Sequence, residues 1–254
     1  MTGVIDNSLI DTSVFADSVS AFLPNTAYVA FSQDGMRPLA ACVSPGDQVS
    51  EGDVIARSSG PTVTAVHTPI PGRVESFTTC LAPNGKKTLA AKIRLSGVFS
   101  YLGKPAQKED LGGVKRSKLQ VILAERGVLN TFLRPVALSS QIAALPPRRR
   151  CIIAVRLFDN DPSQRTDSFI AERYAPEVAE GAAILAGALN AGGVAFLFDK
   201  KTSPRSRRIY TAFDYPCAGA FCSADARKYP AGTMGEILKT VRESGGGPAF
   251  ASIS

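Results

Sequence analysis

Residues 26–97 alternate short apolar runs with clusters of turn-forming residues, and this pattern constrains the fold most strongly. The clusters "SPGD", "RSSGP", "PIPG" and "APNGKK" contain the Gly, Pro and Asn residues that are typical of tight turns between β-strands. "PNGK" predicts a hairpin turn, because Asn and Gly both tolerate positive φ. The stretch shows no helical period and predicts a small all-β unit. The predicted strands are 29–31, 48–56, 63–66, 73–77 and 89–95.

The pattern changes after residue 118. Residues 98–118 are rich in Gly, Pro, Lys and Asp and predict a linker. "KLQVILAERG" has apolar residues at helical spacing and predicts a helix that stops at Gly127. The apolar runs "CIIAVRLFD" and "GGVAFLFDK" predict buried parallel strands, and "RRIYTAF" predicts a third.

Two further helices are predicted between and after these strands. "TDSFIAERYAPEVAEGAAILAGAL" predicts a helix with Thr166 or Asp167 as its N-cap and a break or a kink at Pro176. "TMGEILKTVRES" predicts a last helix capped by Thr233. Alternating strands and helices indicate an α/β domain over residues 119–254. The chain is therefore expected to be an α+β protein in two parts.

Composition places the chain among globular proteins. The hydrophobic fraction is 44% and the charged fraction 20%, which is ordinary for a soluble domain. No run approaches the 18 apolar residues of a membrane helix. The N-terminal segment, residues 1–25, has no basic stretch of the kind that begins a signal peptide. A cytoplasmic location is therefore predicted.

The all-β unit resembles a known carrier fold. "GDQVSEGDVIA" followed by "HTPIPGRV" resembles the barrel-sandwich of biotinyl and lipoyl carriers, with Gly46 and Gly52 at tight turns and Val49, Val54 and Ile55 facing inward. Such carriers attach their group to a Lys at the tip of the central hairpin. No Lys occurs between residues 53 and 72, so neither biotin nor lipoate is expected.

The whole arrangement resembles the RnfC/NqrA family, which comprises the RnfC component of the Rnf electron-transport complex and the NqrA component of the sodium-translocating NADH:quinone reductase. The resemblance extends over residues 27–250 and rests on "DGMRPLAACVSPGDQVSEGDVI", "ERGVLNTFLRP", "DNDPSQRTDSFIAERYAPEVAEGAAIL" and "KYPAGTMGEILKTVRESGGGPA". It implies that the second domain is Rossmann-like and similar to the flavin-binding domain of respiratory NADH dehydrogenases. This chain is expected to be a short form without the ferredoxin-like domain of the Rnf component.

The sequence departs from the family at the glycine-rich loop. In the Rnf component this loop follows the first helix of the α/β domain and cradles FMN and NADH with backbone N–H groups. The corresponding "GVLNTFLRPVAL" keeps only Gly127, and Leu129, Phe132 and Leu133 would crowd a phosphate. We therefore expect Phe132 and Leu133 to be core residues, and no FMN or NADH to bind.

An acidic pair of the family that meets the nucleotide falls near Asp159, Asn160 and Asp161. These residues are either a remnant of a nucleotide site or turn formers before Pro162. The candidate cofactor-binding residues are thus this group and Gly127. The sequence offers no catalytic residue, because it lacks the common nucleophile and phosphate-binding motifs.

The cysteines and the histidine argue against metal chemistry. The chain has five cysteines, and Cys217 and Cys222 do not have the C-x2-C spacing of a zinc or iron–sulfur loop. Their role is left open. His67 is the one histidine and is interpreted as a structural residue beside the turn "TPIPG". Neither a metal site nor an iron–sulfur cluster is predicted.

Positive charge is concentrated in two short segments. The net charge is +7, from 29 basic and 22 acidic residues, with runs at 146–151 and 200–208. No aromatic residue interleaves the second run, so nucleic acid is not expected as a partner. The second run is interpreted either as a solvated loop or as a docking surface for an acidic partner or an anionic membrane. Its basic residues are Lys200, Lys201, Arg205, Arg207 and Arg208.

Three functions compete on this basis. The first is a peripheral subunit on the inner face of the cell membrane, which acts as a scaffold or docking module beside the integral membrane subunits of an Rnf- or Nqr-type ion-translocating redox complex. The second is a divergent FMN- or NADH-binding oxidoreductase subunit. The third is an unrelated barrel-sandwich binding module. Whether the chain is catalytic, which complex it joins and which ion is moved are left open.

Overall fold

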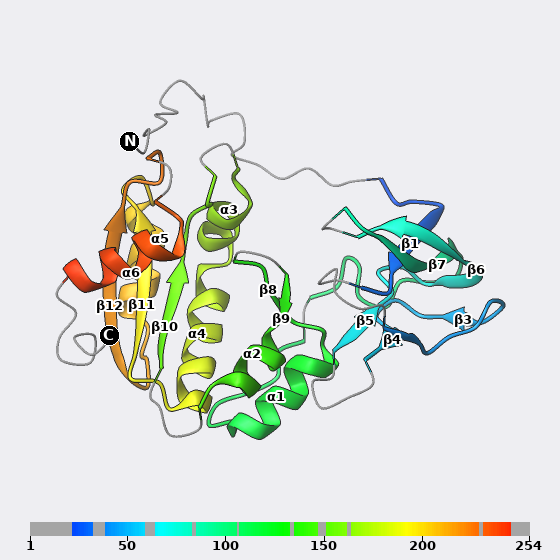
Figure 1. Ribbon diagram of the computed structural model, residues 1–254, viewed down its shortest axis with the longest axis horizontal. Helices are drawn as coiled ribbons and strands as arrows, with labels where there is room; N and C mark the ends of the chain where they lie inside the picture. The colour runs from blue at the N-terminus through cyan, green and yellow to red at the C-terminus, as the bar shows by residue number, and fades with distance from the viewer. Residues whose placement is uncertain are drawn as a thin grey trace. The chain divides into compact units, whose positions relative to one another are not determined.

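The computed structural model describes residues 22–32, 39–58, 64–82, 85–105, 107–132, 135–146, 151–161, 164–228 and 231–244. These residues form two compact units (Figure 1). The sandwich unit contains the described residues of 22–110 and 115–146, and the α/β unit contains 111–114 and the described residues from 151 onward. Each unit is described by itself.

The sandwich unit is built on two antiparallel sheets, which confirms the predicted all-β barrel-sandwich. The four-stranded sheet has the order β1-β7-β6-β3, and the three-stranded sheet has the order β2-β4-β5. The strands are β1 (Thr26–Ala30), β2 (Ala40–Ala41), β3 (Gln48–Val49), β4 (Val54–Arg57), β5 (Ala65–His67), β6 (Gly72–Leu81) and β7 (Lys87–Leu95).

Inward-facing side chains of both sheets form the core of this unit. The rings of Phe31 and Phe77 meet edge to face, with centroids 5.4 Å apart. Val49 and Ile55 are buried as expected, whereas Val54 is only half-buried. The buried cluster comprises Phe31, Val49, Ile55, Ala56, Val66, Ile70, Val74, Ala91 and Ile93.

A turn interrupts the strand that the sequence predicted over 48–56. The chain forms the same Ser-x-Gly-Asp turn twice, before β3 and between β3 and β4. Asp47 accepts a hydrogen bond from the backbone N–H of Ser44 at 2.8 Å, and Asp53 accepts one from that of Ser50 at 2.7 Å. Each carboxylate therefore closes its own turn, as Asp commonly does.

The segment after β7 is fastened to the second of these turns. One carboxylate oxygen of Glu51 accepts hydrogen bonds from the backbone N–H groups of Tyr101, at 2.6 Å, and Leu102, at 3.3 Å. The Tyr101 ring lies so close to Gly52 that a Cβ at residue 52 would be 2.9 Å from it. The first residues of the predicted linker thus pack as part of the sandwich unit.

Two helices and a short ribbon complete the sandwich unit. They are α1 (Arg116–Glu125), β8 (Leu129–Asn130), β9 (Val136–Ala137) and α2 (Leu138–Ala144), with β8 and β9 antiparallel. The Arg116 guanidinium donates to the carbonyl oxygen of Leu145 at 2.7 Å and ties α1 to the end of α2. The sequence pattern assigned these elements to the α/β domain, but they pack with the sandwich.

The α/β unit contains a parallel sheet, as the sequence predicted. The strand order is β10-β11-β12. Helices α3, α4 and α5 follow β10 and β11, and α6 packs on β11 and β12 (Figure 1). The elements are β10 (Ile152–Arg156), α3 (Thr166–Arg173), α4 (Ala175–Leu189), β11 (Gly193–Asp199), α5 (Pro204–Ala212), β12 (Ala218–Ala224) and α6 (Met234–Glu243).

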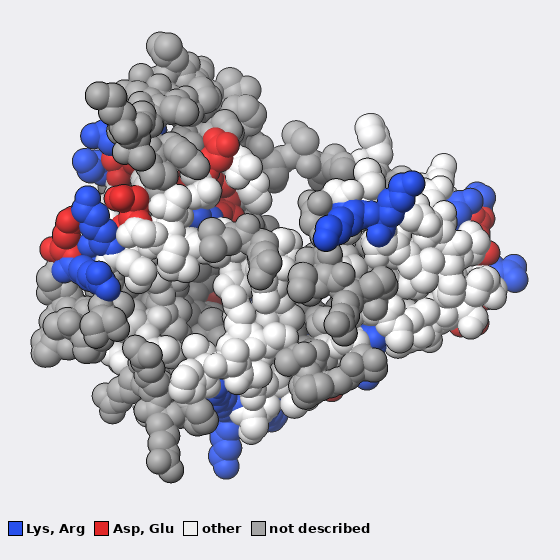
Figure 2. Space-filling model, viewed as in Figure 1, with Lys and Arg blue, Asp and Glu red and all other residues white. Residues whose placement is uncertain are grey.

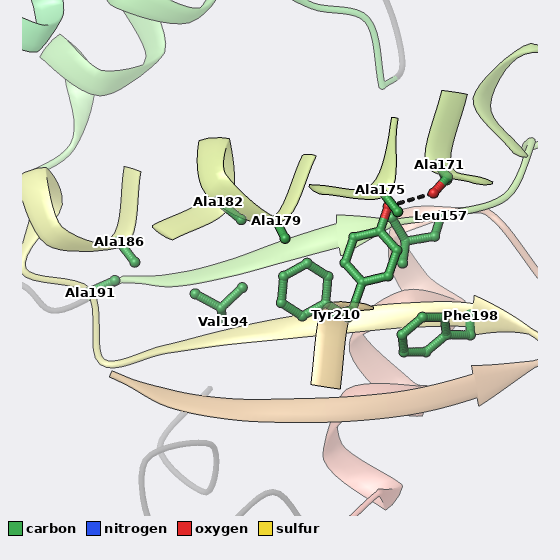
Figure 3. Packing of buried hydrophobic residues seen from close by; sticks show 11 residues of the cluster. Leu157, Ala171, Ala175, Ala179, Ala182, Ala186, Ala191, Val194, Phe198 and Tyr210 are labelled. Carbon is green, nitrogen blue, oxygen red and sulfur yellow. Dashed lines mark hydrogen bonds between the residues drawn. The ribbon is translucent and has the colours of Figure 1, made fainter. Parts of the chain in front are cut away.

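Helix α4 presents a stripe of alanines to the sheet. Ala175, Ala179, Ala182 and Ala186 repeat at intervals of three and four residues and are all buried (Figure 3). Small side chains let the helix approach the large aromatic residues of β11 and α5 closely. Of the predicted break or kink, the structure shows a break, because α3 ends at Arg173 and α4 begins at Ala175 with Pro176 in its first turn.

The predicted third strand at "RRIYTAF" is wrong. These residues lie mostly in α5, where the Ser203 side chain accepts a hydrogen bond from the N–H of Ser206 at 3.2 Å and Pro204 starts the helix. The β-prone Ile209 and Tyr210 belong to the face of α5 that packs on the sheet core. The third strand is β12, whose small residues "AGAFCSA" give a weak strand signal.

Two tyrosines of this core are expected to make the unit sensitive to alkaline pH. Tyr210 donates to the carbonyl oxygen of Ala171 at 2.7 Å, and Tyr215 donates to that of Tyr210 at 3.0 Å (Figure 3 shows the first). Burial raises the pKa of Tyr215 to about 12 and that of Tyr210 further.

Because the unfolded tyrosines ionise near pH 10 while the folded ones keep their protons, the unfolded state gains stability as pH rises. We expect the free energy of unfolding to fall between about pH 10 and 12. Urea unfolding across this range checks it, and the Tyr210→Phe/Tyr215→Phe variant should show a flatter dependence. An unchanged slope in that variant would contradict the assignment.

Candidate functional site at the carboxyl edge of the parallel sheet

The carboxyl ends of β10 and β11 and the first turns of α3 and α5 meet at one edge of the sheet, where α/β proteins commonly bind ligands. A pocket of about 90 Å³ lies there. This is well below the roughly 300 to 1,000 Å³ of sites for drug-sized ligands. Its polar lining residues are Arg165, Ser168, Glu172, Asp199, Lys201 and Thr202.

Asp159 acts as a cap for α3 at this edge. Its side chain accepts hydrogen bonds from the backbone N–H of Asp167 at 2.8 Å, the backbone N–H of Ser168 at 3.0 Å and the Ser168 hydroxyl at 2.7 Å. Asp159 is itself buried. A carboxylate of the chain therefore occupies the position at the helix N-terminus that an anionic ligand would need.

The neighbouring residues are used structurally as well. The Arg156 guanidinium pairs with Asp167 at 2.8 Å and donates to the carbonyl oxygen of Gly232 at 3.0 Å. A Cβ at residue 232 would be 2.8 Å from the Cα of Asn160, so the backbones pack closely there. Asn160 is half-buried and Asp161 is exposed. Nothing in the sequence pattern pointed to the roles of Arg156 and Gly232.

Two other acidic residues at this edge accept hydrogen bonds from backbone groups. Asp199 accepts a hydrogen bond from the N–H of Ala226 at 3.1 Å. Glu172 accepts one from the N–H of Ser203 at the start of α5, at 3.4 Å. A carboxylate from elsewhere in the unit thus lies at the N-terminus of α3 and another lies at the N-terminus of α5. At this edge the N–H groups of Asp167, Ser168, Ser203 and Ala226 therefore already donate to carboxylates of the chain.

Gly127 lies in the sandwich unit and ends α1. It has φ +63°, and the N–H groups of Gly127 and Val128 donate to the carbonyl oxygens of Ala124, at 3.2 Å, and Leu123, at 2.9 Å. This is a Schellman motif. A Cβ at residue 127 would be 2.2 Å from the carbonyl oxygen of Ala65. The positive φ and the close approach of Ala65 both require a glycine at position 127, so no bound ligand is needed to account for it.

The segment after Gly127 differs from the expectation. Phe132 is only half-buried, so it is not the core residue that the sequence suggested. Its backbone N–H donates to the side chain of Asn130 at 2.9 Å, which shapes a turn after β8. Leu133 lies outside the described residues. Truncation of Phe132 should therefore cost less than the roughly 3 to 5 kcal/mol of a core phenylalanine.

The basic segment 200–208 is not a simple loop, because residues 204–208 are helical. Arg207 lies over the Phe198 ring with its guanidinium carbon 4.8 Å from the ring centroid. It also donates to the Ser223 hydroxyl at 3.0 Å and to the carbonyl oxygen of Asp199 at 2.6 Å. Arg207 is therefore part of the fold, whereas Lys200, Lys201, Arg205 and Arg208 are exposed.

The described cysteines and acidic residues do not gather into a metal site. Among the residues that the structure describes, no cluster of three or more His, Cys, Asp or Glu side chains could hold a metal ion. Cys217 precedes β12, Cys222 lies within it, and both are free thiols. Burial, with Cys151 nearby, raises the pKa of the Cys217 thiol. No helix in the described part of the chain is long and apolar enough to cross a membrane.

The fold defines a class of protein in which a barrel-sandwich unit precedes an α/β unit with a parallel sheet. Residues 15–97 match the family model described as the RnfC barrel sandwich hybrid domain, and this match spans about a third of the 254-residue chain. It includes β1 to β7. No curated protein matches the chain.

Proposed function

We propose that the chain is a peripheral subunit of a membrane-bound, ion-translocating redox complex of the Rnf type, and that it acts as a scaffold or docking module. The observation that carries this proposal is the match of residues 15–97 to the RnfC barrel sandwich hybrid domain. The absence of Lys between residues 53 and 72 supports the proposal, since the sandwich then has no Lys at the usual place for attaching biotin or lipoate. The Nqr-type complex is the related alternative.

A non-catalytic role is favoured by the carboxyl edge of the parallel sheet. A flavin nucleotide needs several converging backbone donors, whereas Asp159 already accepts from two N–H groups in the first turn of α3, and Glu172 accepts from the N–H of Ser203, the N-cap of α5. The volume of about 90 Å³ is small for a flavin. These observations favour a role for Asp159 as the cap of α3 over the hypothesis that Asp159, Asn160 and Asp161 are the remnant of a nucleotide site.

Four exposed basic residues around the start of α5 are the proposed contact with an integral membrane subunit. Lys200 and Lys201 precede α5, and Arg205 and Arg208 lie one helical turn apart on it. Such a patch is suited to an acidic protein surface and is sensitive to salt, because exposed charges are screened within about 8 to 10 Å. Arg207 is excluded from this patch by its contacts within the fold.

Purification of the tagged full chain from detergent-solubilised native membranes tests the proposal. We expect mass spectrometry to identify integral membrane redox subunits in the purified complex. The Lys200→Glu/Lys201→Glu/Arg205→Glu/Arg208→Glu variant should lose them, because four charges are reversed. Lys115→Glu/Lys118→Glu, with two exposed lysines of the sandwich unit, is the control.

Two results would contradict this function. If the chain purifies alone from native membranes at low salt, the proposed role in a complex fails. If the purified chain is yellow and titrates with FMN or NADH at micromolar concentrations, it is instead a divergent oxidoreductase subunit. An independent barrel-sandwich module would give neither membrane subunits nor a flavin spectrum.

A further inference from the structure

The β6–β7 hairpin extends beyond the core of the sandwich unit. Phe77 pairs with Ala91 on the core-facing side, where Ala91 is fully buried. Side chains alternate along a strand, so the next residues on this face are Thr79 and Leu81 in β6, and Leu89 and Lys87 in β7. Leu81 is 68% exposed and Leu89 41% exposed. Beyond the core this face therefore carries two exposed leucines, with the exposed Thr79 between Phe77 and Leu81.

Two backbone hydrogen bonds join the described residues at this end of the hairpin. The N–H of Ala82 donates to the carbonyl oxygen of Lys86 at 2.8 Å, and the N–H of Gly85 donates to that of Ala82 at 2.9 Å. Thr88 and Ala90, on the opposite face of β7, are buried. One face of the hairpin end is therefore packed, and the face that carries Leu81 and Leu89 is presented outward.

Positive charge accompanies these leucines. Residues 76–95 contain Lys86, Lys87, Lys92 and Arg94 and no acidic residue. Lys92 and Arg94 both pair with Glu75, the first at 2.8 Å. Lys86 and Lys87 are exposed at the far end of the hairpin. Figure 2 shows Lys and Arg side chains gathered over this end of the β6–β7 ribbon.

We infer that the end of the β6–β7 hairpin, through Leu81, Lys86, Lys87 and Leu89, docks on an anionic lipid surface. Leucines at the boundary between headgroups and acyl chains, with lysines at the lipid phosphates, are the arrangement of interfacial anchors. A protein partner is disfavoured because two leucines are too few for the apolar centre of an interface that buries roughly 800 Å² per partner. The inference rests on the proposed function only for the presence of a membrane nearby.

Co-sedimentation of the purified full chain with lipid vesicles tests this inference. Vesicles of phosphatidylcholine with phosphatidylglycerol should bind the chain at low salt, and vesicles of phosphatidylcholine alone should not. Lys86→Ala/Lys87→Ala should weaken binding by roughly 30-fold, since each lysine near an anionic surface contributes about fivefold. Leu81→Ser should weaken binding without changing the melting temperature, because Leu81 is mostly exposed.

The matched control is Lys115→Ala/Lys118→Ala, which removes the same charge from exposed positions of the same unit. If this control loses as much affinity as the hairpin variant, only the net charge of +7 acts and the inference is overturned. Absence of binding to the anionic vesicles also overturns it. Co-purification with membrane subunits is unaffected by either result, so the proposed function is judged separately.

Discussion

Replacing Gly127 by alanine is expected to lower the free energy of unfolding of the sandwich unit by about 2 to 5 kcal/mol. The residue has φ +63°, which costs a residue with a Cβ roughly 1 to 2 kcal/mol. The new Cβ would also be 2.2 Å from the carbonyl oxygen of Ala65, so β5 and the end of α1 must move apart. Forcing such a shift in a packed region costs roughly 1 to 3 kcal/mol more.

Gly103→Ala is the control for this prediction. Gly103 has φ +75°, and a Cβ there would meet nothing within 4 Å. Gly103→Ala should therefore lower the free energy of unfolding only by the roughly 1 to 2 kcal/mol that a positive φ costs a residue with a Cβ. Urea unfolding of both variants, followed by circular dichroism, separates the two effects. Equal losses in the two variants would show that the contact between Gly127 and Ala65 is unimportant.

Replacing Asp159 by alanine is expected to destabilise the α/β unit by about 2 to 3 kcal/mol. The carboxylate accepts three hydrogen bonds from α3, two of them from backbone N–H groups of the first turn. Removal of an anionic acceptor that serves as a helix cap leaves those donors unsatisfied. Asp159→Asn should retain part of the stability, because one amide oxygen can still accept.

The exposed neighbour Asp161 provides the comparison for Asp159. Asp161→Ala should change the free energy of unfolding by less than about 1 kcal/mol. If Asp159 were instead a nucleotide ligand, Asp159→Ala would leave stability nearly unchanged and would abolish the binding of FMN or NADH. Chemical unfolding and calorimetric titration of the same variants distinguish these roles.

Much of the architecture could be predicted from local patterns. Turn residues delimit the strands of the sandwich, and the apolar runs at 151–159 and 192–200 mark β10 and β11. The pattern failed at α5, because Ile209 and Tyr210 have strand propensity while Ser203 and Pro204 start a helix. It also missed the turn that separates β3 from β4, where an Asp side chain closes only four residues.

The candidate site was harder to predict, since its members are joined by tertiary contacts. An acid after a β-strand is equally consistent with a ligand site and with a cap on the next helix. Asp159 is assigned as a cap only by its distances to Asp167 and Ser168. Gly127 is similar, because a glycine after a helix predicts a stop but not the approach of Ala65 from a strand about sixty residues earlier.

The contact between Glu51 and the segment after β7 affects where the sandwich unit can be separated from the rest of the chain. The matched family region ends at residue 97. Tyr101 and Leu102 nevertheless supply both N–H groups that Glu51 accepts, and the Tyr101 ring covers Gly52. A fragment cut at residue 97 would uncover that glycine and leave the carboxylate without these donors. An expression boundary after residue 146 keeps this turn closed and also retains α1 and α2, which belong to the same unit.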